Sequence, residues 1–226
     1  INLSILLKNI HFLDGWSSTE ILLQWALNVF SYGIAGMFFY NGCNALEEKI
    51  QSGEMDIFYT QPRSIFWNFM FRNISPIFIF HICFSTIFLI CSLRALNIGW
   101  SMTKLLYMIV LLICAVCIQA SVMIAFASTS FRIIKSGNIV STAIYGFRNF
   151  TTYPFSIYGK GMKLLLTFMI PYAFVSYYPA LYILDKESNL FDSCMIYLEP
   201  FFVGLFILLA YNIWRKGTYV YKGTGT

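Results

Sequence analysis

The residues best suited to chemistry lie in one charged segment between two long apolar runs. Its carboxylate, amide, guanidinium and turn-forming members are Glu47, Glu48, Gly53, Glu54, Asp56, Gln61, Pro62 and Arg63. Carboxylates at this density can bind basic groups, whereas charge and unpaired backbone are costly in lipid. We therefore expect this segment, within residues 44–72, to lie in water on one face of a membrane and to contact another molecule.

Catalytic and metal chemistry have little support in the sequence. No Ser/His/Asp set, paired-carboxylate site or metal-spaced cluster occurs, and neither does the G-x-x-x-x-G-K-[ST] phosphate loop. Cys114 and Cys117 have the spacing of a redox or zinc pair, but they lie in the uncharged run 105–131, where cysteine behaves as a small hydrophobe. We expect no enzymatic activity, no metal and no cofactor on this chain.

The elements that position the charged segment are membrane spans. Hydrophobic residues make up 58% of the chain and charged residues 11%, against about a quarter charged in soluble domains. The runs 21–46 and 73–93 carry no charge, and each exceeds the roughly 20 residues that a helix needs to cross the bilayer core. Spans are expected at 21–42, 74–93, 105–127, 136–153 and 194–214, and residues 1–7 are interpreted as the end of a truncated first span.

The region before the last span departs from this pattern. Residues 164–184 carry no charge but contain Pro171 and Pro179, and a proline inside a helix removes a hydrogen bond and clashes with the preceding turn. Two architectures fit, a kinked span or a re-entrant pair of short helices that dips in from one face. We favour the re-entrant pair.

Arg148 is an ionisable group within the run 136–153, and such groups are functional candidates by default. It could line a path and meet an anionic or polar substrate. It could also pair with Glu199 or extend its charge to the membrane surface.

The net charge of +5 does not indicate nucleic acid, because the basic residues are scattered at span ends. There they are expected to anchor helices at anionic lipid headgroups. Lysine and arginine are nearly balanced between the two sides, so charge alone does not orient the chain.

Three ordered motifs resemble the permease subunits of ABC-2-type exporters. They are residues 51–62 (QSGEMDIFYTQP), residues 153–154 with 170–180 (YP and IPYAFVSYYPA), and residues 214–219 (WRKGTY), which are similar to a closing W-x-x-G-x-x-x-Y. Gly15-Trp16-Ser17 also fits, whereas Thr60 and Glu199 depart from the pattern. The resemblance covers nearly the whole chain and implies an all-α, six-span permease domain over residues 1–226.

The resemblance also implies partners and site residues. In such permeases the first intracellular loop forms a coupling helix that docks in a cleft of a cytosolic ATPase subunit, which would bind ATP and Mg²⁺. Residues 44–72 would then be cytosolic, with the carboxylates of Glu47, Glu48, Glu54 and Asp56 facing basic residues of that partner. Gly53 and Pro62 would fix the turn at its ends, and a second permease subunit, identical or related, would complete the path.

Residues 153–184 would then form an outer re-entrant element. Its aromatic rings with hydroxyls suit the membrane interface, where proline-broken helices could act as a gate. The expected gate residues are Tyr153, Pro154, Pro171, Tyr172, Tyr178 and Pro179.

The expected function is that of a multi-pass exporter subunit in a prokaryotic plasma membrane. Its cargo would be hydrophobic or amphipathic, such as a peptide, a drug or a lipid-like molecule. The alternative is the substrate-binding membrane subunit of a vitamin-uptake system, whose Ala-x-x-x-Ala helix faces have no counterpart here. A small channel or structural membrane protein would leave residues 44–72 unexplained.

Overall fold

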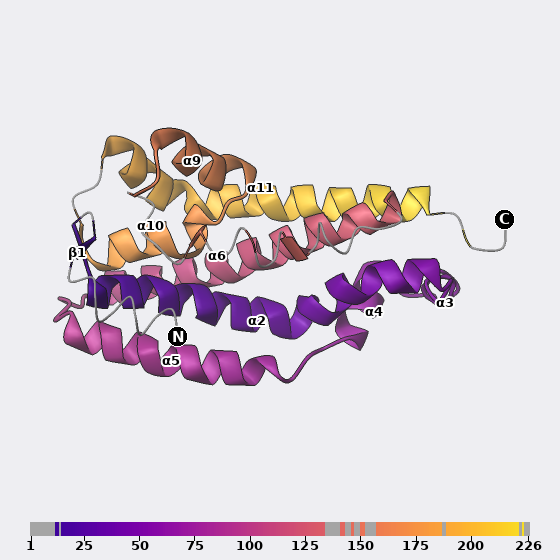
Figure 1. Ribbon diagram of the computed structural model, residues 1–226, viewed down its shortest axis with the longest axis horizontal. Coiled ribbons are helices and arrows are strands. Elements are labelled where there is room, and N and C mark those ends of the chain that lie inside the picture. Colours follow the sequence, from indigo (N-terminus) through magenta and orange to yellow (C-terminus); the bar gives the residue numbers. More distant parts are fainter. Residues whose placement is uncertain are drawn as a thin grey trace.

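Long apolar helices lie roughly side by side in an elongated bundle (Figure 1). The computed structural model describes residues 12–13, 15–133, 141–142, 146, 150–151, 157–186, 189–221 and 223. In chain order the elements are β1 (Phe12–Leu13), β2 (Trp16–Ser17), α2 (Ser18–Gln51), α3 (Asp56–Tyr59), α4 (Ile65–Arg72), α5 (Phe78–Ala95), α6 (Met102–Ala127), η1 (Ser128–Phe131), α9 (Lys160–Leu164), η4 (Leu165–Met169), α10 (Ala173–Ile183) and α11 (Leu190–Val220). Apart from the short antiparallel pair β1–β2, these elements are helical, so the all-α prediction is confirmed.

Four of the described helices, α2, α5, α6 and α11, are long and apolar enough to cross a membrane. They coincide with four of the five complete spans that the sequence predicts, and α6 also includes Lys104, which the prediction left outside the span. The truncated span at 1–7 lies outside the described residues, and the run 136–153 lies largely outside them. The prediction of a polytopic membrane domain is therefore confirmed.

Helix α2 extends farther than the sequence predicts. The prediction ends its span near Gly42 and begins a polar loop at Asn44, but the helix continues to Gln51. Residues 45–49 are good helix formers, and Gln51 Nε2 donates a hydrogen bond to Glu47 Oε1, one turn earlier, at 3.2 Å. At 1.5 Å per residue, its 34 residues give a helix about 51 Å long, which exceeds the roughly 30 Å hydrocarbon core.

Helix α2 is the central element of the bundle and packs against α4, α5, α6 and α10. Its contact with α5 is especially close at Gly33 and Gly36. A Cβ atom on Gly33 would lie 2.8 Å from Ile82 Cγ1, and one on Gly36 would overlap the ring of Phe78. Small residues at a membrane helix crossing let the two backbones approach, so these two glycines set the distance between α2 and α5.

The proline-containing region is a pair of helical segments, Lys160–Met169 and Ala173–Ile183, with a bend of 111° between them. The bend lies at Pro171, whereas Pro179 lies inside α10 without ending it. Each arm is about 15 Å long, and two such arms at this angle cannot reach across a core of about 30 Å. The geometry therefore favours the re-entrant pair over the kinked span.

Ion pairs hold the loops at the end of the bundle that carries α9, opposite α3 (Figure 1). Lys104 Nζ lies 2.5 Å from Asp185 Oδ2, and Lys186 Nζ lies 2.9 Å from Glu20 Oε2. The Lys186 ammonium also donates to the Gly15 carbonyl at 2.6 Å and lies 4.1 Å from the centre of the Trp16 ring. These contacts join the start of α2 to the loop after α10.

Candidate functional site

The site begins at a tight turn between α2 and α3. Gly53 adopts a φ of +75°, a conformation that side-chain-bearing residues rarely take. The backbone then turns back, because the Met55 amide donates to the Lys49 carbonyl at 3.1 Å and the Asp56 amide donates to the Gly53 carbonyl at 3.1 Å. This local geometry explains why a glycine suits the turn that carries α3.

Two apolar side chains fasten α3 to the rest of the protein. Met55 and Phe58 are buried, and the Phe58 ring meets the Phe69 ring of α4 edge to face at 5.1 Å. The Arg72 guanidinium lies 5.8 Å from the centre of the Phe58 ring. This apolar contact therefore joins α3 to the C-terminal half of α4.

The other side of α3 is bonded to the C-terminal end of α11, 165 residues away. The Tyr221 hydroxyl donates to Asp56 Oδ1 at 2.8 Å, and the Tyr59 hydroxyl donates to the Thr218 carbonyl at 2.7 Å. The rings of Tyr59 and Tyr221 stack at 5.3 Å with an interplanar angle of 23°. We call these four residues, Asp56, Tyr59, Thr218 and Tyr221, the α3–α11 clasp.

Both tyrosines of the α3–α11 clasp keep their protons at neutral pH. Burial, followed by the electrostatic effects of the neighbouring Tyr221 and Asp56, raises the pKa of Tyr59 to about 12. Burial, followed by the hydrogen bond to Asp56, raises the pKa of Tyr221 to about 12. The two hydroxyls therefore remain hydrogen-bond donors over the physiological pH range.

Sequence reasoning named Asp56 but missed Tyr59, Thr218 and Tyr221. A signal was present, because Tyr221 occupies the final position of the closing W-x-x-G-x-x-x-Y motif, counted from Trp214. The glycine of that motif, Gly217, lies against Phe131, and a Cβ atom there would be 3.0 Å from Phe131 Cγ. The motif thus combines a close helix contact with a hydrogen-bond donor.

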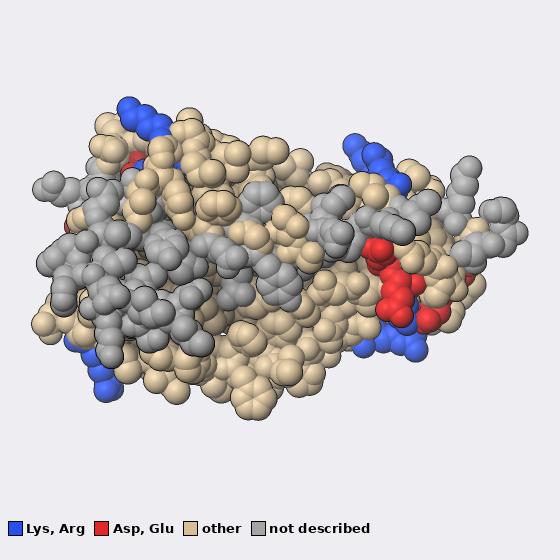
Figure 2. Space-filling model, viewed as in Figure 1, with Lys and Arg blue, Asp and Glu red and all other residues tan. Residues whose placement is uncertain are grey.

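Some of the remaining predicted side chains of this segment are exposed, and others form hydrogen bonds within the chain. Glu48, Glu54, Pro62 and Arg63 are exposed, and Figure 2 shows acidic side chains gathered at this end of the molecule. Glu54 pairs with Lys49, whose hydrogen bond and charge lower the pKa of that carboxyl.

Three predicted side chains are partly buried and bonded within the chain. Glu47 accepts from Gln51, Gln61 accepts from Asn68, and Asp56 accepts from Tyr221. The prediction that all four carboxylates face a partner therefore needs correction for Asp56, because the α3–α11 clasp already uses one of its oxygens. On the same short helix, α3, the apolar side chain of Ile57 is 51% exposed.

The expected gate residues lie elsewhere, at the α9 end. Tyr172 and Tyr178 have no exposed surface, and the hydroxyl of Tyr178 lies 3.1 Å from Thr167 Oγ1. Pro171 and Pro179 are buried as well. The prediction put these rings at the membrane interface, but α10 packs against α2, α6 and α11, which places the rings in the protein interior. Tyr153, Pro154 and Arg148 lie outside the described residues.

Glu199 on α11 is also fully buried, and neither of its carboxylate oxygens has a hydrogen-bond partner among the described residues. Its predicted alternative partner, Arg148, lies outside them. In the described part of the chain, no group of three or more His, Cys, Asp or Glu side chains could hold a metal ion.

Comparison with known families gives a match over nearly the whole chain. The family described as ABC-2 family transporter protein matches residues 1–225. Curated proteins and solved structures gave no match. The family match covers α3, the α3–α11 clasp and all four helices long enough to cross a membrane. The chain therefore belongs to the ABC-2 transporter family and is a multi-pass membrane permease subunit of an ABC transporter.

Proposed function

We propose that this chain forms half of the translocation path of an exporter and that residues 44–72 receive movement from a cytosolic ATPase subunit. The observation that carries the proposal is the α3–α11 clasp. It bonds a short helix at the tip of the molecule directly to the end of a membrane-spanning helix. A push on α3 would thus be passed to α11 without an intervening flexible linker.

The exposed surface near α3 has the chemistry that such a contact needs. Glu48 and Glu54 present carboxylates, and Ile57 on α3 presents apolar surface. An interface with an apolar centre and a charged rim is typical of protein partners. The proposed partner surface is a cleft with an apolar floor and basic edges, on a subunit that binds ATP and Mg²⁺.

Aromatic packing behind the α3–α11 clasp supports transmission into the bundle. The Trp214 ring of α11 meets Phe66 of α4 at 5.4 Å and Phe131 of η1 at 5.2 Å, edge to face in both cases. Since close-packed aromatic groups resist deformation, a displacement of α4 would reach α11 and η1 together. Through these contacts, α4, η1 and the C-terminal part of α11 would move together.

The proposed cargo is a hydrophobic or amphipathic molecule, such as a peptide, a drug or a lipid-like compound. The helices that would line the path consist mostly of apolar and aromatic residues, which suit such a cargo better than a sugar or an ion. Export is the direction that the resemblance to ABC-2-type exporters implies. The proposed location is the plasma membrane.

A first prediction concerns assembly. Purified in mild detergent together with a cytosolic ATP-binding subunit, this chain is expected to form a complex of at least four chains, two permeases and two ATPases. The physical reason is that about six spans enclose only half of a path. Mass measurement of the intact complex and chemical cross-linking would count the chains. A monomer that transports cargo on its own would overturn the proposal.

A second prediction concerns direction. Cells that express the chain with its ATPase are expected to lose a fluorescent amphipathic cargo faster than cells with an ATPase variant unable to hydrolyse ATP. Replacing both Pro171 and Pro179 should slow this loss, because the bend of the re-entrant pair depends on the backbone restriction at Pro171. ATP-dependent accumulation of the cargo inside the cells would contradict export.

A further inference from the structure

A groove on the exposed face of α4 combines positive charge with exposed aromatic rings. It has a volume of about 580 Å³ and is lined by Arg63, Ser64, Trp67, Asn68, Phe71 and Arg72. The lining residues recur three to four positions apart, the spacing that places side chains on one face of a helix. The opposite face of α4 buries Phe66, Phe69 and Met70 in the bundle.

The two arginines give the groove its charge. Both are exposed, and in the described part of the chain neither guanidinium forms an ion pair with a carboxylate. Arg72 is held in place by the Phe58 ring. A guanidinium presents a planar fork of donors that matches phosphate oxygens. The Ser64 hydroxyl, which does not cap α4, and the Asn68 amide add polar groups between the arginines.

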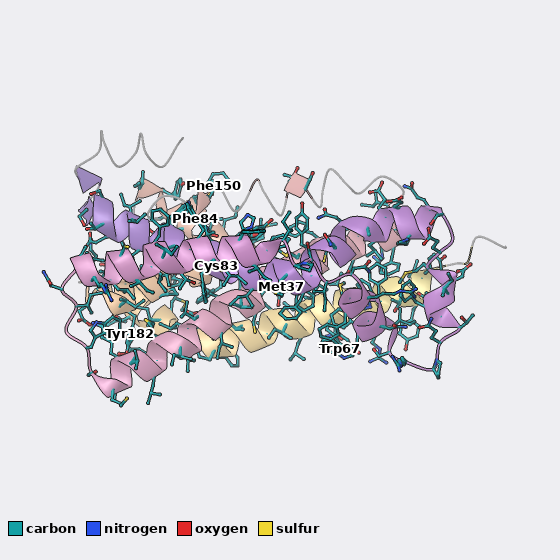
Figure 3. The ribbon with its side chains drawn as sticks, turned by 90° about the horizontal axis from the view of Figure 1, so that it is seen from below. Met37, Trp67, Cys83, Phe84, Phe150 and Tyr182 are labelled. Atoms are coloured by element: carbon teal, nitrogen blue, oxygen red, sulfur yellow. The ribbon has the colours of Figure 1, made fainter. Side chains whose placement is uncertain are left out.

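The rings in the groove face the surroundings of the bundle. Trp67 is 52% exposed and Phe71 47% exposed, and they stack on each other at 5.4 Å with an angle of 11°. Figure 3 shows Trp67 on α4, at the end of the molecule where the bundle meets α3. Five residues after α4, Ile77 at the N-cap of α5 is 64% exposed, and Phe80 in the first turn of α5 is 75% exposed. Exposed apolar surface on a membrane-spanning helix contacts lipid chains.

We propose that this groove binds one anionic phospholipid, with its phosphate on Arg63 and Arg72 and its acyl chains along α5. The groove shares Arg63 with the predicted coupling residues, whereas Glu48, Glu54 and Ile57, which carry the proposed ATPase contact, do not line it. Aromatic rings combined with basic groups are typical of the membrane–water interface, and basic groups there are attracted to anionic headgroups. The exposed rings distinguish this occupant from a soluble anion, which would use the arginines alone.

Native mass spectrometry of the purified chain, titrated with phosphatidylglycerol or phosphatidylcholine, tests the proposal. The parent protein is expected to retain one phosphatidylglycerol and to lose phosphatidylcholine. The double variant Arg63→Gln, Arg72→Gln is expected to bind phosphatidylglycerol about tenfold more weakly, because two charge-assisted contacts are lost. The Arg63→Lys, Arg72→Lys variant keeps the positive charge but lacks the planar guanidinium. Its affinity for phosphatidylglycerol should lie between those of the parent and the double glutamine variant.

The matched control is Arg215→Gln, Lys216→Gln, which removes the same charge at the same end but outside the groove. It is expected to bind phosphatidylglycerol like the parent. Equal loss in both double variants would mean attraction to overall charge, and undiminished binding in Arg63→Gln, Arg72→Gln would place the lipid elsewhere. Displacement of the lipid by millimolar glycerol phosphate would mean a site for a soluble anion. Each of these three results would overturn the proposal.

Discussion

The variant Tyr221→Phe is expected to export about tenfold less cargo per ATP hydrolysed, while its amount in the membrane stays unchanged. The substitution removes only the hydroxyl that donates to Asp56 Oδ1 and keeps the ring stacked on Tyr59. A hydrogen bond to a charged group contributes about 1.5–3 kcal/mol, and about 1.4 kcal/mol corresponds to a factor of ten. Cargo export and ATP hydrolysis measured on the same reconstituted complex give the ratio.

The matched control for this experiment is Tyr219→Phe. Tyr219 is 75% exposed, and its hydroxyl accepts a hydrogen bond from Arg215 of the same helix at 3.4 Å. This variant should export as much cargo per ATP hydrolysed as the parent. The double variant Glu54→Ala, Asp56→Ala removes a surface carboxylate as well as the acceptor in the α3–α11 clasp, so it should lose at least as much coupling as Tyr221→Phe. An unchanged export-to-hydrolysis ratio in both Tyr221→Phe and the double variant would show that coupling runs elsewhere.

The second large effect is expected at the other end of the bundle, in the variant Lys163→Met. The Lys163 ammonium lies 2.7 Å from Asp192 Oδ2 and 5.0 Å from the centre of the Tyr177 ring. The lysine side chain is 18% exposed and the aspartate side chain 5% exposed. Removing one partner leaves the Asp192 charge buried without compensation, which costs about 3–5 kcal/mol. Thermal unfolding in detergent should therefore occur at a clearly lower temperature.

Two further variants show whether the loss comes from the broken ion pair. Lys160→Met removes a charge from the same helix at an exposed position and should unfold like the parent. Lys163→Met combined with Asp192→Leu removes both charges and should recover much of the lost stability, because apolar residues often replace buried ion pairs without net cost. Parent-like unfolding of Lys163→Met would contradict the assigned role of this pair.

The membrane spans could be predicted from the sequence because apolar length is a local property. Uncharged runs of more than about 20 residues predict spans wherever they occur, and α2, α5 and α6 followed. The run that gives α11 contains Glu199, so only its overall apolar character indicated a span. The ends were less predictable. The charges of Glu47 to Lys49 suggested a loop, yet helix propensity carried α2 through them until Gly53, where a positive φ turns the chain. Charge thus predicted where the chain leaves the lipid, and not where the helix ends.

The pairing in the α3–α11 clasp could not be predicted, because its partners are 159 and 165 residues apart and no periodic pattern links them. The closing motif marked Tyr221 but not the residue that it contacts. The same reason applies to Tyr172 and Tyr178. A tyrosine suits the membrane interface and the protein interior equally well, and only the packing of α10 against α2, α6 and α11 decides between them. Local pattern identified these residues as unusual, but their roles depend on contacts between distant elements.

The close crossing of α2 and α5 has a mechanical consequence. Gly33 and Gly36 lie at the middle of a helix that runs from Ser18 to Gln51, so the crossing acts as the fulcrum of a two-armed lever. For a rod about 51 Å long, a tilt of about 5° about this point carries each tip roughly 2 Å, and the two tips travel in opposite directions. Inward motion of the arm that bears Gly53 therefore accompanies outward motion of the arm that bears Glu20.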